Sequence, residues 1–153
     1  MVPDVISLKT EKTFLMTPDT RDFWFLPLGG CGEIGMNMNL YGHDEQWIMI
    51  DCGVTFRDPD GGTASGYDVQ MPDPAFIAER KEQLQGILLT HAHEDHIGAV
   101  AHLWPRLRCP IYATQFTAEM LRRKLAEQGL LSKVDIIHVE AGDRMQLGVF
   151  DIE

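Results

Sequence analysis

The segment GILLTHAHEDH, residues 86–96, constrains the fold of this chain more than any other part of its sequence. Residues 86–90 have the length, the apolar character and the flanking glycine of a buried β-strand. The six residues after them hold three histidines and two acidic residues, and a helix is expected from about residue 95 to residue 104. A buried strand that ends in a polar turn and leads into a helix is typical of α/β folds.

The rest of the chain extends this pattern, with antiparallel strands first and strand–helix units after them. The expected strands are residues 23–28, 37–42, 46–51, 86–90, 109–114, 134–139 and 145–152, with a hairpin turn at 42–45. The other expected helices are 74–83 and 115–128, and the apolar face of the latter comprises Phe116, Met120, Leu121 and Leu125. This order favours a layered α/β sandwich over residues 23–153, with residues 1–22 as an N-terminal extension.

The histidine-rich turn has the residue types and the spacing of a two-metal site. Residues two apart in an extended stretch point the same way, so His91 and His93 can converge on one metal. Asp95 and His96 lie just past the turn and can face a second metal, and Asp95 is also the candidate catalytic residue. Imidazole and carboxylate ligands suit Zn²⁺ and its neighbours. Two such metals could share a hydroxide and clamp a phosphoryl or carbonyl centre.

The alternative interpretation makes Asp95 a helix N-cap and the three histidines polar surface residues. It leaves unexplained why three of the six histidines of the chain fall within six residues. The other histidines are isolated and are interpreted as structural or exposed: His43, His102 and His138.

Asp51 ends an apolar strand and precedes Cys52 and Gly53. A carboxylate at that place could accept a hydrogen bond from a ligand histidine and hold it in one tautomer, although an aspartate that only forms a turn is the simpler alternative. Cys52 is interpreted as a small buried residue.

The glycine-rich segment LGGCGEIGMN, residues 28–37, does not match a phosphate-binding P-loop. Gly30 to Gly35 fit the spacing G-x-G-x-x-G of a dinucleotide-binding loop, but a strand-like segment follows instead of a helix. We therefore interpret these glycines as residues that let the backbone pass close to the metals.

Charge and composition narrow the classes of protein. The net charge of −10 argues against a broad nucleic-acid-binding surface, but not against a local channel, because bound metals add positive charge there. Three cysteines do not form a disulfide framework, and no apolar stretch is long enough to span a membrane. We expect an intracellular protein with no membrane partner.

With its His-x-His-x-Asp-His motif, the sequence resembles the metallo-beta-lactamase superfamily, and more closely the ribonuclease J family of its β-CASP branch. The resemblance covers nearly all of residues 23–153 and rests on PLGGCGEIGMN, IDCGVTF, GYDVQMPD, LTHAHEDHIGA and the stretch from LWP to PIYAT. It implies the first half of an αββα sandwich. It also implies an RNA-processing hydrolase with 5′-to-3′ exonuclease and endonuclease activity, two zinc ions (or manganese), RNA as partner and a homo-oligomer.

Carried over by position, the resemblance places His91 and His93 on one metal and Asp95 and His96 on the other. Asp51 becomes the structural aspartate of the first superfamily motif. Some family members also hold calcium through backbone oxygens of a loop that matches Ser65 and Tyr67. The sequence alone does not favour such a site, although three acidic residues lie in this loop: Asp58, Asp60 and Asp68.

The family's remaining metal ligands, including a histidine in a His-Ser-Ile-Pro stretch, have no counterpart in this sequence, and the last expected strand ends with an unpaired edge at the end of the chain. We therefore expect an N-terminal fragment of a longer protein, inactive by itself. Two other interpretations stay open. One is a small-molecule metallo-hydrolase such as a thioesterase or lactonase, and the other is a non-catalytic metal-binding fragment.

Overall fold

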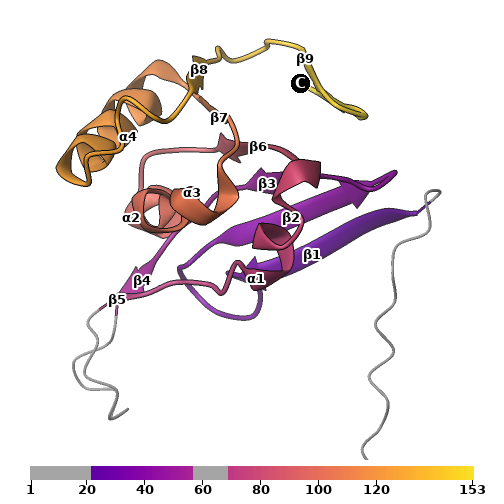
Figure 1. Ribbon diagram of the computed structural model, residues 1–153, viewed down its shortest axis with the longest axis horizontal. Coiled ribbons are helices and arrows are strands. Elements are labelled where there is room, and N and C mark those ends of the chain that lie inside the picture. Colours follow the sequence, from indigo (N-terminus) through magenta and orange to yellow (C-terminus); the bar gives the residue numbers. More distant parts are fainter. Residues whose placement is uncertain (1–21, 57–68) are drawn as a thin grey trace, which may run out of the picture.

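A computed structural model describes residues 22–56 and 69–153, in which a six-stranded sheet is the central element (Figure 1). Its strands, in spatial order, are β1 (Phe23–Gly29), β2 (Met38–His43), β3 (Gln46–Ile50), β6 (Leu84–Leu89), β7 (Ile111–Ala113) and β8 (Ile136–His138). The first three strands are antiparallel, and β3, β6, β7 and β8 are parallel. This arrangement confirms the predicted α/β class.

Shorter elements complete the fold. Two short ladders pair β4 (Thr55–Phe56) with β5 (Val69–Gln70) and β9 (Met145–Leu147) with β10 (Phe150–Ile152). The helices are α1 (Ala75–Ala78), the 3₁₀ turn η1 (Lys81–Gln83), α2 (Glu94–Ile97), α3 (Val100–Leu107) and α4 (Gln115–Glu127).

The main core lies between the sheet and the helices. Alternation along β3 sends Trp47 and Met49 into this core, where they pack with Ile87 of β6 and with buried residues of α3 and α4. Ile48 and Ile50 point to the other face of the sheet. The central parallel strands are therefore apolar on both faces, as is usual where both faces are covered.

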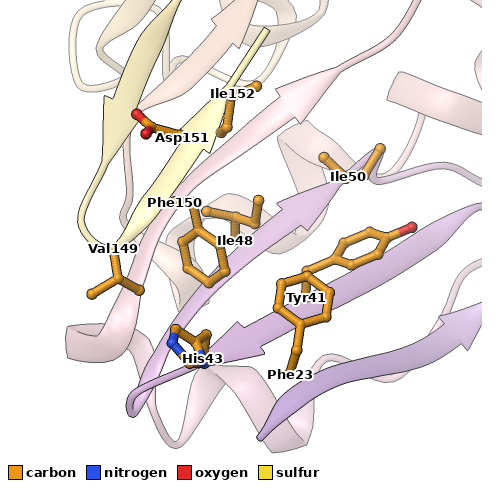
Figure 2. Close-up of a pocket in the computed structure, with 9 residues that line it drawn as sticks. All are labelled: Phe23, Tyr41, His43, Ile48, Ile50, Val149, Phe150, Asp151 and Ile152. Atoms are coloured by element: carbon orange, nitrogen blue, oxygen red, sulfur yellow. The ribbon is translucent and has the colours of Figure 1, made fainter. Parts of the chain in front are cut away.

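The second face of the sheet is only partly covered by the described residues. The β9–β10 hairpin packs there, with Phe150 and Leu147 buried against Ile48. Figure 2 shows the apolar pocket beside the hairpin, in which Phe23 and Tyr41 lie near Phe150. Phe23 is 66% exposed, so part of the apolar surface on this face stays uncovered by the described residues.

The helix predicted for residues 95–104 is wrong in one respect, because it is split into α2 and α3. Ala99 N donates to Cys52 O over 3.0 Å, and Asp95 O accepts from Asn37 N over 2.9 Å. The two groups that would form one helical hydrogen bond are therefore engaged with other loops. The competing bonds interrupt the helix at Gly98–Ala99 and tie the motif to its neighbours.

Three further predictions differ from the structure. The helix predicted for 74–83 shortens to α1 and η1, because Arg80 leaves helical geometry at φ −117°: its N–H bonds to Ile77 O, while Phe76 O accepts from its guanidinium. The strand predicted for 145–152 is a hairpin that turns at Gly148, where φ is +57°. Phe116 is 71% exposed, because it lies five residues before Leu121, about 140° around the helix from the buried face.

Residues 1–21 and 57–68 lie outside the described residues. The predicted N-terminal extension is therefore untested, as is the calcium loop. That loop contains Asp58, Asp60, Ser65, Tyr67 and Asp68. Within the described ranges, no helix is both long and apolar enough to cross a membrane.

The thiols give a test of the core. Burial raises the pKa of the Cys52 thiol well above its usual value and that of Cys109 to about 12, whereas Cys31 is exposed. A thiol is nucleophilic only as the thiolate, so raised pKa values keep the two buried groups unreactive at pH 8. We expect a chromogenic disulfide reagent to label one thiol of the 153-residue chain quickly and all three in urea. Fast labelling of all three in the native chain would contradict this packing.

Candidate metal centre

The residues predicted for the metal site lie at one edge of the sheet, where the parallel strands β3 and β6 end. β3 leads into Asp51, and β6 leads into Thr90 and His91. Asp51 N donates to Leu88 O over 2.9 Å, so the pairing of the two strands continues to the site. The carboxyl ends of neighbouring parallel strands thereby bring together residues that are 39 positions apart in the sequence.

Asp51 is a buried carboxylate with three donors around it. Its side chain is 6% exposed, and its Oδ2 lies 2.7 Å from Nδ1 of His96. Its Oδ1 accepts a 2.8 Å hydrogen bond from the Thr90 N–H, and the Thr90 hydroxyl lies within 3.0 Å of both carboxylate oxygens. Asp51 itself has φ +63°, a strained value for a residue other than glycine. This geometry suits the predicted role of holding a ligand histidine.

Thr90 is a site residue that the sequence did not indicate. Its hydroxyl donates its single hydrogen to Asp51, and it lies 3.0 Å from Nδ1 of His91. It must therefore accept from an Nδ1–H of His91. The carboxylate of Asp51 likewise only accepts, so His96 also carries its proton on Nδ1. In the neutral form of each ring, Nε2 is then the nitrogen without a proton, the form that binds a metal.

Two close contacts join donor atoms within one cluster, in which the ring centroids of His91 and His96 also lie 4.0 Å apart. Nε2 of His91 lies 3.1 Å from Nδ1 of His93, and Nε2 of His96 lies 3.3 Å from Oδ2 of Asp95. Two ligands at about 2.0–2.1 Å from a tetrahedral zinc lie about 3.3–3.4 Å apart. Each pair therefore fits one edge of a zinc coordination sphere. The pairs are also those that the sequence predicts for separate metals.

Each pair is short of a full ligand set. Within residues 22–56 and 69–153, no group of three or more histidine, cysteine or acidic side chains converges so as to hold a metal ion. A catalytic zinc usually has three protein ligands. The alternative role of Asp95 as an N-cap is wrong, because the N-cap of α2 is His93 and has no side-chain capping bond.

The three isolated histidines lie apart from these pairs, as expected. His43 is in the β2–β3 hairpin, where its Nδ1 is 2.9 Å from Asp22 O, and His102 and His138 are exposed. Another contact to the motif comes from α4, whose Lys124 forms an ion pair with Glu94. This pair anchors α4 against the turn that carries the metal donors.

Known proteins resemble this chain in sequence and in fold. The sequence profile of the metallo-beta-lactamase superfamily matches residues 32–152. Among solved structures, the metallo-beta-lactamase fold protein YhfI from Bacillus subtilis superposes with a TM-score of 0.53 at 16% identity, over 83% of this chain and 49% of that one. That similarity supports the fold alone.

The curated relatives are more similar in sequence. A ribonuclease J from Sinorhizobium meliloti is 50% identical over 150 residues, which is 95% of this chain and 26% of the relative. A ribonuclease J from Synechocystis is 34% identical over 130 residues, which is 84% of this chain and 20% of the relative. The resemblance to ribonuclease J is confirmed, and the chain spans between a fifth and about a quarter of the length of these relatives.

The Thr90 hydroxyl can be tested without changing the shape of its side chain. In the full-length protein, Thr90→Val removes the group that holds His91 and Asp51. We expect zinc affinity to fall roughly 10–100-fold, the usual effect of losing a group that orients a metal ligand. Competition with a chromophoric chelator measures this affinity, and Thr90→Ser, which keeps the hydroxyl, serves as the control. Equal affinity in the valine variant and the wild type would refute the role of Thr90.

Proposed function

Since the chain belongs to the metallo-beta-lactamase superfamily, we propose that the full-length protein is a metal-dependent ribonuclease that hydrolyses phosphodiester bonds in RNA. The observation that carries this proposal is the identity of 50% to a ribonuclease J over 95% of the chain. The two donor pairs at the carboxyl edge of the sheet support it, because they supply the ligand types of a hydrolytic metal site.

The proposed ligand sets are His91 with His93 for one metal, and Asp95 with His96 for the other. Asp95 supplies the anionic ligand among the four, and we assign the catalytic role to it. The mixed nitrogen and oxygen donors favour zinc, with manganese as the alternative. Bound divalent metals would lower the pKa of a water molecule and offset negative charge on the phosphoryl oxygens.

The residues around the ligands hold them for this chemistry. Asp51 keeps the proton of His96 on Nδ1, and Thr90 does the same for His91. In the neutral form of each ring, Nε2 would then carry the lone pair that binds a metal. The net charge of the chain, −10, gives no broad attraction for RNA, so phosphate recognition would depend on the metals.

The finer properties are proposed from the family resemblance. They comprise both 5′-to-3′ exonuclease and endonuclease activity on RNA, a cytoplasmic location and assembly into a homo-oligomer. The described residues supply only two donors for each metal. We therefore propose that the 153-residue chain, taken alone, does not turn over RNA.

Removal of one ligand pair tests the proposed activity. In the full-length protein, His91→Ala with His93→Ala should reduce cleavage of 5′-monophosphorylated RNA by roughly 10²–10³-fold or more, because charge stabilisation in the transition state is lost. His102→Ala, an exposed histidine on α3, is the matched control and should keep wild-type activity. Labelled RNA resolved on a gel gives the rates.

The outcome separates this proposal from its rivals. Undiminished RNA cleavage in the double variant would contradict the ligand assignment. Hydrolysis of thioesters or lactones by a wild-type protein that leaves RNA intact would favour the small-molecule hydrolase instead. Activity on neither class of substrate would favour a non-catalytic metal-binding role.

A further inference from the structure

Asn37 lies against the second donor pair, although nothing in the sequence marks it as a site residue. It is the last residue of the glycine-rich segment and directly precedes β2. Its Nδ2 lies 3.1 Å from Asp95 O, 3.4 Å from Asp95 Oδ2 and 3.3 Å from His96 Nε2. The side chain therefore touches both residues of the pair, from a position 58 residues away from Asp95.

The surroundings of Asn37 determine which way its amide points. Two of the three atoms around the amide end, the carbonyl oxygen and the carboxylate oxygen of Asp95, can only accept a hydrogen bond, so the NH₂ group belongs there. Its Oδ1 packs against Gly30, where an added Cβ would lie only 2.3 Å from that oxygen. Gly30, at φ +80°, thus leaves just enough room for the asparagine in this orientation.

The backbone of Asn37 makes separate contacts that do not depend on the side chain. Its N–H donates to Asp95 O over 2.9 Å, and its carbonyl accepts from Gly53 N over 2.9 Å. These bonds join the glycine-rich loop to the loop after β3 and to the metal motif. Replacement of the side chain would leave them in place, so the effect of the amide can be measured apart from the fold.

We propose that Asn37 is a positioning residue that orients Asp95 and His96 as a ligand pair. Its amide donates one hydrogen to the Asp95 carbonyl and directs the other toward the Asp95 carboxylate, and so holds that carboxylate beside His96. A carboxylate ligand keeps lone pairs for such a donor while it binds a metal, and hydrogen bonds of this kind commonly hold ligating carboxylates. The inference rests on the proposed assignment of Asp95 and His96 as metal ligands.

The role predicts an effect on one metal and not on the other. The donor atoms beside the Asn37 amide belong to Asp95 and His96, whereas no contact joins this amide to His91, which lies against Thr90. Loss of the amide should therefore weaken one of the two metal-binding events. A general loss of folding would weaken both.

Titration of the metal-free full-length protein with Co²⁺ tests this. For Asn37→Ala, we expect the affinity of one site to fall roughly 10–100-fold and that of the other to stay within about twofold of wild type. Asn39→Ala is the matched control, because Asn39 lies two positions further on in β2 and shares the face of Tyr41, away from the helix-side core. Its affinities should equal those of the wild type.

Two further measurements separate this role from a loss of folding and from a failure of the ribonuclease proposal. Thermal unfolding of the metal-free variants, including Asn37→Ser as a second replacement, shows whether the fold survives. Unchanged affinity at both sites, equal losses at both sites, or no Co²⁺ binding by the wild type would each overturn the proposal. RNA cleavage by the wild type is assayed separately, so a protein that binds two metals but leaves RNA intact would refute the ribonuclease function and not the role of Asn37.

Discussion

The candidate metal centre depends on one buried carboxylate. Asp51 directly follows β3 and accepts hydrogen bonds from Thr90, which directly follows β6, and from Nδ1 of His96, in α2. One side chain thus connects two strands and a helix at the edge of the sheet. Since a buried carboxylate is costly unless it is fully hydrogen-bonded, this contact strongly restrains the elements around it. The contact with Asp51 also determines which nitrogen of His96 faces the site. Through Thr90, Asp51 orients the ring of His91 in the same way.

A set of backbone hydrogen bonds between loops surrounds this carboxylate. In the loop after β3, Cys52 N donates a hydrogen bond to His96 O over 2.7 Å, and Cys52 O accepts one from Ala99 N over 3.0 Å. Gly53 permits the approach, because a Cβ there would lie 1.7 Å from Asp95 O. These bonds replace part of the regular helix between α2 and α3. The interruption of the helix and the position of the ligands therefore have the same physical cause.

Local patterns in the sequence were sufficient for most elements. Burial shows in the order of neighbouring residues, as in the alternation of β2, the apolar run of β6 and the length of α4. The division of the donors between two metals stays a prediction. Contacts between residues distant in the sequence cannot be predicted from local patterns, so the sequence does not indicate that Thr90 and Asn37 contact the site. The split between α2 and α3 cannot be predicted for the same reason, because the carbonyl that competes for Ala99 N belongs to Cys52. The exposure of Phe116 depends on how α4 packs on the sheet, which the sequence of the helix alone does not show.

The central claim is that the motif divides into two ligand pairs, in which His91 and His96 bind metal through Nε2. Anomalous diffraction at the zinc absorption edge, from crystals of the full-length protein, tests it most directly. We expect two zinc positions, one about 2.0–2.1 Å from Nε2 of His91 and Nδ1 of His93, and the other at a like distance from Nε2 of His96 and next to the Asp95 carboxylate. Zinc bound through Nδ1 of His96, or no zinc at this edge of the sheet, would contradict the claim.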